Sequence, residues 1–198
     1  MENKYKNYKK NRKKDYKKNE KEKMKVSDVD LKENRIIIVD GEIDDKLARD
    51  TIELLLKMDA CNHKDITMYI NSSGDSVAAG LAIYDIMNII KSDIKTVGLG
   101  RCASMASVLL INGKKGKRCI LENAEIMIHE VSSFSAGKLT EMKERLDHTH
   151  SLNERLMKII ASKTNRTLKQ VKQDTINKDN WIDSKTALKY GFVDKILI

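Results

Sequence analysis

The chain of 198 residues contains no proline, two phenylalanines and one tryptophan. The absence of proline excludes collagen-like chains and proline-rich linkers. Because aromatic residues make up only 5% of the sequence, Leu, Ile, Val, Met and Ala must fill any core. The longest apolar runs, such as residues 108–111, are far shorter than the roughly 20 residues that span a bilayer. No membrane partner is therefore expected.

Positive charge is concentrated at the start of the chain. The formal net charge is +9, but residues 1–25 alone carry 11 lysines and Arg12 against four acidic residues. This composition is typical of a solvated, disordered leader, although it could also contact RNA, anionic lipid or an acidic protein. We therefore expect a lysine-rich leader at 1–25 and a folded domain at 26–198. Nucleic acid is not expected as a partner of that domain, because its charges nearly balance.

The cysteines are few and odd in number: Cys61, Cys102 and Cys119. Their spacing does not resemble a metal site, and reduced, buried thiols in a reducing compartment are the expectation. The basic start is not followed by the apolar segment of a signal peptide. These features predict a cytoplasmic protein with no metal centre.

Strand and helix patterns alternate along the chain, which predicts an α/β domain with mostly parallel strands. Strands are expected at 35–39, 66–71, 94–100 and 193–197, with an extended segment at 118–129 and a loop at 72–75. Helices are expected at 44–58, 76–90, 104–112, 138–163, 168–173 and 184–190. Asp44 or Asp45 is the expected N-cap of the first of these helices.

Ligands in α/β sheets usually bind where strand ends meet helix starts, and residues 71–76 and 100–105 form two such junctions. Ser104 would lie at a helix N-terminus, where free N–H groups and the helix dipole favour negative charge. That position suits a nucleophile and the oxyanion that it creates. A serine at this position is more often a plain N-cap.

A nucleophilic serine needs a base, and His129 follows the apolar segment 126–128, so its ring is expected at a strand end. The other histidines lie in a polar loop or a charged helix and are expected at the surface: His63, His148 and His150. A third group must orient the ring. The sequence pattern leaves three candidates open around Trp181: Asp174, Asp179 and Asp183.

Several short motifs occur in one order at characteristic spacing: GEIDD at 41–45, YINS at 69–72, AGLAIYD at 79–85, ASMA at 103–106, GKKGKR at 113–118, MIH at 127–129, DT at 174–175 and YGFVD at 190–194. Together they resemble the proteolytic subunits of ATP-dependent Clp proteases over residues 35–198. The resemblance implies a crotonase-like (ClpP-like) spiral of βαβ units with helix 138–163 as a protruding handle. It also implies a serine endopeptidase.

By this resemblance Ser104 is the nucleophile and His129 is the general base. Counting back from Tyr190 places the third member of the triad at Asp179, whereas counting forward from Asp174 reaches Lys178, one residue early. The chain thus has one extra residue within 176–178. Asp179 is the expected third member, with Asp174 as the runner-up.

The expected oxyanion hole consists of the backbone N–H groups of Met105 and Asp75. Asp75 occupies the place of the second glycine in the family's Asn-Ser-Pro-Gly-Gly loop, so a Cβ and a carboxylate are added there. If the backbone needs the freedom of glycine, or if the carboxylate faces the oxyanion, activity is weakened. Glu130 replaces a family glutamine and adds a further carboxylate beside the base.

The resemblance implies a homo-oligomer of two stacked heptameric rings that enclose the serines. An AAA+ Clp unfoldase would use ATP and feed in protein and peptide substrates, and this subunit itself would need no cofactor. Three alternatives remain. They are a weakly active or inactive ClpP-like paralogue that assembles with an active subunit, a crotonase-fold enzyme acting on acyl thioesters, and an RNA- or lipid-binding protein acting through the leader.

Overall fold

A computed structural model of the chain describes residue 31 and residues 33–198, so the expected leader at 1–25 lies outside the described residues. The chain divides into two units, Met1–Ile36 and Ile37–Ile198. The elements described below belong to the second unit, apart from the first residue of strand β1. Within the described residues, no helix has the length and apolar character needed to cross a membrane.

The described part of the chain forms a seven-stranded sheet. The pairings β2–β3, β3–β4, β3–β5 and β4–β7 are parallel, and the pairing β5–β6 is antiparallel. The main path of the sheet runs β1-β2-β3-β4-β7, while β5 pairs with β3 and β6 pairs antiparallel with β5. The strands are β1 (Ile36–Ile43), β2 (Ile66–Asp75), β3 (Ile94–Ala103), β4 (Arg118–Leu121), β5 (Glu125–Ile128), β6 (Asn180–Asp183) and β7 (Lys195–Leu197). The prediction of a mostly parallel α/β domain is confirmed.

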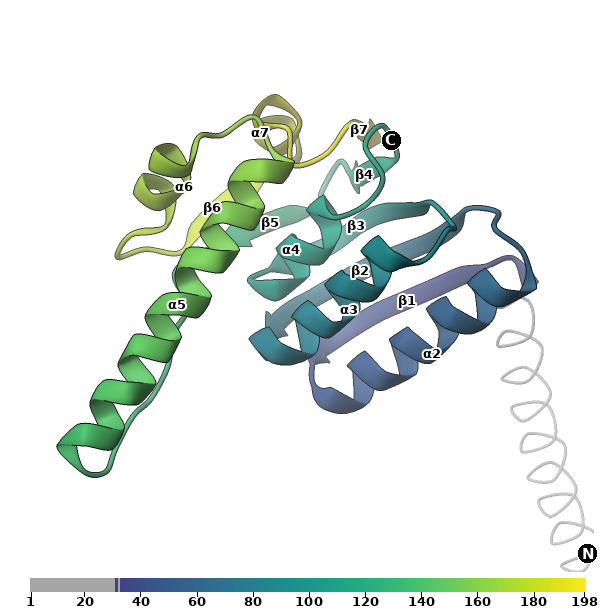
Figure 1. The fold of residues 1–198 in the computed structure, drawn as a ribbon. Helices are drawn as coiled ribbons and strands as arrows, with labels where there is room; N and C mark the ends of the chain where they lie inside the picture. Colours follow the sequence, from purple (N-terminus) through teal and green to yellow (C-terminus); the bar gives the residue numbers. More distant parts are fainter. Residues whose placement is uncertain (1–30, 32) are drawn as a thin grey trace, which may run out of the picture. The chain divides into compact units, whose positions relative to one another are not determined.

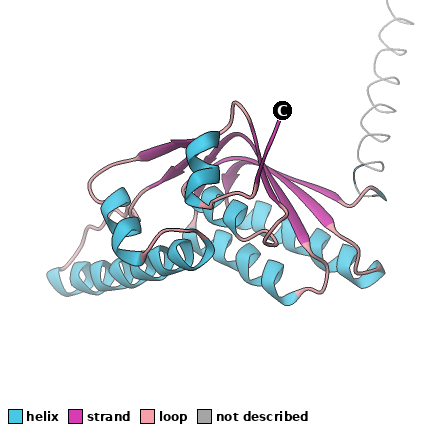
Figure 2. Ribbon diagram, turned by 90° about the horizontal axis from the view of Figure 1, so that it is seen from above, coloured by secondary structure: helices cyan, strands magenta, loops and turns pink. Residues whose placement is uncertain are grey.

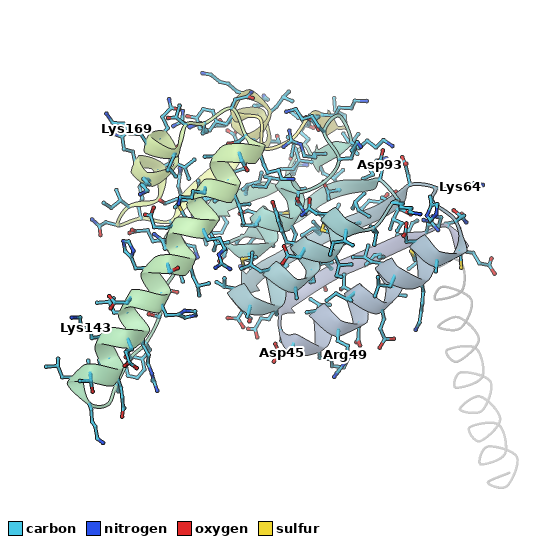
Figure 3. The ribbon with its side chains drawn as sticks, viewed as in Figure 1. Asp45, Arg49, Lys64, Asp93, Lys143 and Lys169 are labelled. Atoms are coloured by element: carbon cyan, nitrogen blue, oxygen red, sulfur yellow. The ribbon has the colours of Figure 1, made fainter. Side chains whose placement is uncertain are left out.

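The helices of the described unit are α2 (Asp45–Cys61), α3 (Val77–Ile89), α4 (Met105–Ile111), α5 (Leu139–Lys163), α6 (Leu168–Thr175) and α7 (Ser184–Tyr190). Helices α2, α3 and α4 lie in sequence along one face of the sheet, and α5 follows α4 (Figures 1 and 2). Charged side chains such as Asp45, Arg49 and Lys143 point away from the helices into solvent (Figure 3).

Helix α4 is deeply buried, because all seven of its residues are buried. A helix that is apolar on every side needs neighbours on every side, and α4 contacts β2, β3, α3 and α5. Ser104, directly before this helix, is therefore anchored between the sheet and the core. The core, rather than a surface loop, fixes the position of the serine.

Several predicted elements agree closely with the structure. Asp44 caps α2 by accepting a hydrogen bond from the N–H of Leu47 at 2.7 Å, and helix 184–190 has the predicted bounds. The loop expected at 72–75 is wrong, because Ser72 pairs with Cys102 and β2 continues to Asp75. Pairing with a neighbouring strand here overrides the local preference of polar residues for turns.

Three further differences concern short or exposed features. The extended segment at 118–129 is two strands, β4 and β5, and strand β6 was not expected. Strand β6 has four residues, of which only Ile182 is buried, so it shows no periodic apolar pattern. Cys61, expected to be buried, is exposed at the end of α2, while Cys102 and Cys119 are buried.

Candidate active site

Three neighbouring strands bring Ser104, His129 and Asp179 to one edge of the sheet. Ser104 follows β3, and His129 follows β5, which runs parallel to β3 with Ala103 opposite Met127. Asp179 directly precedes β6, which runs antiparallel to β5. Because the ends of parallel strands and the start of an antiparallel neighbour meet at one edge, residues far apart in the sequence converge there.

The backbone of Ser104 adopts an unusual conformation, with φ 53° and ψ −124°, and its side chain makes no capping hydrogen bond. The plain N-cap interpretation therefore does not describe this serine. Its N–H donates to the carbonyl oxygen of Met127 at 2.9 Å, and its own carbonyl accepts from the hydroxyl of Ser107 at 2.7 Å. A sharp, strained turn from strand to helix of this kind presents a serine hydroxyl to a reacting group.

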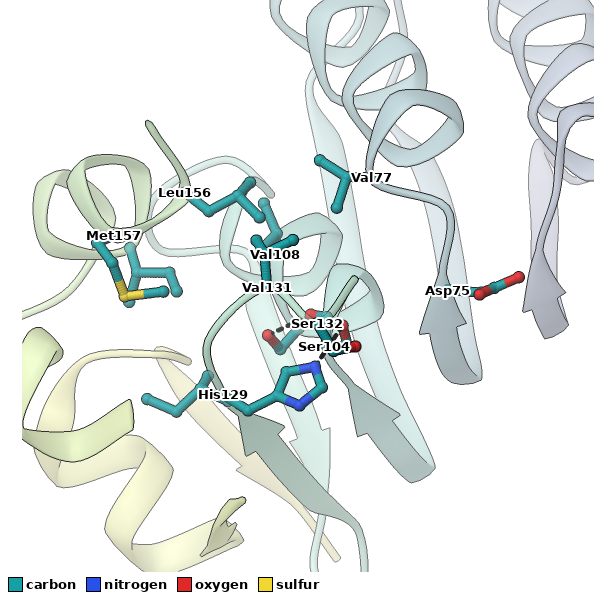
Figure 4. Close-up of a pocket in the computed structure, with 12 residues that line it drawn as sticks. Asp75, Val77, Ser104, Val108, His129, Val131, Ser132, Leu156 and Met157 are labelled. Carbon is teal, nitrogen blue, oxygen red and sulfur yellow. Dashed lines mark hydrogen bonds between the residues drawn. The ribbon is translucent and has the colours of Figure 1, made fainter. Parts of the chain in front are cut away.

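The ring of His129 links the other two side chains. Its Nε2 lies 2.9 Å from Oγ of Ser104, and its Nδ1 lies 3.2 Å from Oδ1 of Asp179 (Figure 4 shows the contact with Ser104). With the proton on Nδ1, the ring donates to Asp179 and accepts the hydroxyl proton of Ser104. The geometry can thus move a proton from serine to imidazole while a carboxylate holds the tautomer.

The two other candidate carboxylates have different partners. Asp174 accepts hydrogen bonds from Nε and a terminal nitrogen of Arg166 at 3.0 and 2.6 Å. Asp183 caps α7 by accepting from the N–H of Thr186 at 2.7 Å, and this hydrogen bond lowers the pKa of the Asp183 carboxyl. Of the three, Asp179 is the carboxylate that the structure brings to His129.

The end of β2 lies directly against the Ser104 turn. A Cβ on Gly74 would stand 2.6 Å from the carbonyl oxygen of Ala103 and 2.8 Å from the nitrogen of Met105. The residue after it, Asp75, has φ 117° and an exposed side chain. The absence of a side chain on Gly74 thus allows the end of β2 to lie directly against the backbone of Ala103 and Met105.

The backbone of Asp75 has a positive φ, a conformation that favours glycine. Non-glycine residues in sparsely populated regions are strained by about 1–3 kcal/mol. Figure 4 shows the Asp75 side chain directed away from Ser104 and His129. Backbone strain, rather than a carboxylate facing the reacting atoms, is thus the effect that this arrangement favours.

A small pocket of about 50 Å³ lies beside Ser104 and His129. Side chains from α3, α4, β5 and α5 provide its apolar walls: Val77, Val108, Ile128, Leu156, Met157 and Ile160. Asp75, Ser107, Val131 and Ser132 complete the lining. An apolar side chain placed next to the serine would be removed from water in this pocket.

The remaining candidate groups take no part in this arrangement. Cys102 is buried, its thiol donates to the carbonyl of Ile70 at 3.2 Å, and burial raises its pKa to about 12, so the thiol stays protonated. His63 contacts Asp59 at 3.1 Å, and the two histidines of α5 are exposed. Among residues 31 and 33–198, no group of three or more potential metal ligands is present.

Two hydrogen bonds beside the site could not be predicted from the sequence. Glu130 accepts a hydrogen bond from the backbone N–H of Asn177 at 3.1 Å, and Asn153 accepts one from the N–H of Val131 at 3.1 Å. Both bonds join segments that are distant in the chain, so neither periodicity nor a local motif could have revealed them.

Comparison with known proteins shows the family of the chain. A family model described as Clp protease matches residues 18–198. Proteins named ATP-dependent Clp protease proteolytic subunit, from Streptococcus pyogenes serotype M5 (strain Manfredo) and Streptococcus equi subsp. equi (strain 4047), are each 42% identical to the chain over 170 residues. The matched region covers 84% of this chain and 86% of each relative. The chain therefore belongs to the Clp protease family and is a serine-type peptidase.

Proposed function

We propose that this chain is the proteolytic subunit of an ATP-dependent Clp protease and cleaves peptide bonds with Ser104, His129 and Asp179. The observation that carries the proposal is the continuous hydrogen-bonded arrangement of these side chains, with Nε2 of His129 2.9 Å from the serine hydroxyl. Relatives that are 42% identical bear the name of such a subunit.

The chemistry follows from the positions of these groups. His129 takes the hydroxyl proton as Oγ of Ser104 attacks the peptide carbonyl, and Asp179 holds the ring and stabilises its protonated form. The backbone N–H groups of Met105 and Asp75 stabilise the oxyanion. His129 then protonates the leaving amine, and water hydrolyses the acyl-enzyme.

The pocket beside Ser104 supports a preference in the substrate. Its walls are aliphatic and methionine side chains, so burying an apolar side chain there stabilises the bound substrate by roughly 25 cal/mol per Å² of area removed from water. We therefore expect cleavage after apolar residues of a protein chain rather than after charged ones.

The proposal includes an assembly. Helix α5 and the segment before it expose large apolar side chains: Phe134, Leu139, Met142 and Leu146. Clustered exposed apolar side chains of this kind are typical of protein interfaces. We propose that α5 is the handle of a crotonase-like spiral subunit and joins two stacked heptameric rings, in the cytoplasm. A partner AAA+ unfoldase would consume the ATP, and the subunit itself would use no cofactor.

A weakly active paralogue that assembles with an active subunit is the second candidate. The observation in its favour is the strained backbone of Asp75 beside the serine. It shares the fold and the assembly with the first candidate and differs only in rate, so one measurement on the isolated protein separates the two.

The test is hydrolysis of a short fluorogenic peptide with an apolar residue before the cleaved bond, with particle size recorded. Replacing Ser104 by Ala should lower kcat by a factor on the order of 10⁶, while Ser162→Ala, an exposed serine of α5, should leave it unchanged. A serine-directed fluorophosphonate should label wild type but not Ser104→Ala. Retained hydrolysis in Ser104→Ala would overturn the proposal, and an unlabelled, inactive wild type would favour the paralogue.

A further inference from the structure

The pairing between strands β5 and β6 ends one residue before Asp179. The antiparallel register of β5 and β6 runs from Glu125 opposite Asp183 to Ile128 opposite Asn180. One step further along the same register, His129 faces Asp179. Both of these residues lie beyond the ends of their strands, so no strand pairing of their own holds them together.

The turn before Asp179 is exposed. All of residues 176–179 are exposed, and the side chain of Asp179 is 61% accessible. Asn177 has φ 55°, a left-handed conformation that asparagine tolerates. The family resemblance described above implies one extra residue within this turn, at 176–178.

The hydrogen bonds of this turn mostly return to the helix before it. The N–H of Ile176 donates to the carbonyl of Lys172, and that of Lys178 donates to the carbonyl of Thr175 at 3.4 Å. Asn177 instead donates its N–H to Oε2 of Glu130 at 3.1 Å. This bond crosses from the Asp179 turn to the residue that directly follows His129.

We propose that Glu130 is a positioning residue, whose carboxylate fixes the turn at 176–178 so that Asp179 stays within hydrogen-bond reach of His129. The inference rests on the proposed function of the Ser104 site. A hydrogen bond from a backbone N–H to a carboxylate is stronger than a neutral one. It acts where the β5–β6 ladder has ended, and it ties the acid to the segment that carries the base.

Loss of the hydrogen bond between Glu130 and Asn177 should slow the chemical step. An exposed carboxylate on an untethered turn spends time away from the ring, and the imidazole then loses the partner that selects its tautomer. Substrate binding in the apolar pocket does not involve this turn, because none of residues 176–179 lines the pocket. The effect should therefore appear in kcat and not in KM.

The first test measures kcat and KM of peptide hydrolysis for wild type, Glu130→Ala and Glu130→Gln. Glu130→Ala should lower kcat by about 10- to 100-fold, the size expected when a reacting group is displaced by about an ångström. Glu130→Gln should recover most of the rate, because its amide oxygen can still accept from Asn177. Glu125→Ala is the matched control, since it removes an exposed carboxylate from the start of β5, the strand that ends just before His129, and should leave kcat unchanged.

The second test asks whether Glu130 acts through Asp179. In an Asp179→Ala background, adding Glu130→Ala should change kcat no further, because the group that it positions is already gone. Independent, multiplicative losses would overturn the inference. The same variants can be compared by the rate of fluorophosphonate labelling of Ser104, with particle size as the check on assembly.

The outcomes separate this inference from the proposed function. If Glu130→Ala keeps the kcat of wild type while Ser104→Ala is inactive, the role of Glu130 is overturned and the proposed function stands. Retained activity in Ser104→Ala would overturn the proposed function itself. A loss in Glu130→Gln as large as that in Glu130→Ala would also count against the hydrogen bond to Asn177.

Discussion

A Cβ atom on Gly74 would stand 2.8 Å from the Cβ of Ser104 and 2.6 Å from the carbonyl oxygen of Ala103. The end of β2 and the turn that carries the serine are therefore in direct backbone contact. This contact leaves no room for a side chain, and it sets the distance between the amide of Asp75 and that of Met105. Gly74 is thus required by geometry at the proposed oxyanion site.

We predict that Gly74→Ala lowers kcat by about 100-fold or more, because the methyl group must push the Ser104 turn out of place. Peptide hydrolysis and fluorophosphonate labelling measure the effect. Gly41→Ala is a matched control, since Gly41 also has a positive φ, 78°, but no atom lies within 4 Å of the added Cβ. That variant should lose stability, by about 1 kcal/mol, and keep its kcat. An equal loss of kcat in both variants would contradict the steric argument.

We predict that Asp75→Gly raises turnover, because glycine adopts φ 117° without strain and leaves the oxyanion amide free to align. The free energy of unfolding should rise by about 1 kcal/mol, the relieved strain less the entropy that glycine adds to the unfolded chain. Asp75→Asn separates strain from charge. It should behave like wild type, since the carboxylate points away from the serine (Figure 4). Unchanged or lower turnover in Asp75→Gly would contradict the prediction.

Local patterns in the sequence predicted much of the fold and two of the three proposed triad members. Helix 184–190 and the Asp44 cap follow from residues that are close in the chain. Ser104 was a candidate because it lies at the start of a predicted helix, and His129 because it follows the apolar segment 126–128. The family resemblance then implied their roles. For such features the information lies within a few residues of the site, so periodicity and capping preferences suffice.

The third carboxylate could not be chosen from local patterns. Asp179 faces His129 because Ile128 pairs with Asn180, and the register of two strands some fifty positions apart in sequence is a property of the packed sheet. Strand β6 has too few buried residues to show a periodic apolar pattern in the sequence. The hydrogen bond between Glu130 and Asn177 could not be predicted either, because it also joins segments that are distant in the sequence.

We predict opposite effects for the two neighbouring acids. Asp179→Asn should lower kcat by about 10⁴-fold with little change in stability, because the exposed carboxylate acts on the tautomer of His129. Asp174→Asn should keep kcat within a few-fold of wild type. It should instead lower the free energy of unfolding by about 1.5–3 kcal/mol, the value of a charged hydrogen bond, since it weakens the pair with Arg166. Kinetics and urea unfolding of both variants measure this, and a reversed pattern would make Asp174 the third triad member.

The buried pair of Arg118 and Asp194 predicts how stability depends on pH. The Arg118 side chain is 1% exposed and that of Asp194 is 12% exposed. Burial alone would raise the pKa of Asp194, but hydrogen bonds from the Arg118 guanidinium and from the N–H groups of Arg118 and Gly116 lower it well below its usual range. Because the unfolded value is about 3.9, this stabilisation is complete above about pH 5 and is lost as the pH falls below about 4.

Asp194→Asn should therefore lower the free energy of unfolding at pH 7 by about 3–5 kcal/mol, because it leaves the buried Arg118 without its counter-charge. As the pH falls from 5 to 3, the gap between wild type and variant should narrow, because Asp194 of the unfolded wild-type chain takes up a proton while Asp194 of the folded chain stays ionised. Urea unfolding across this range measures both effects. Asp50→Asn, which removes one side of the exposed pair with Lys46, should show no measurable change at pH 7. A gap between wild type and Asp194→Asn that stays constant with pH would show that the carboxylate charge does not provide the stabilisation.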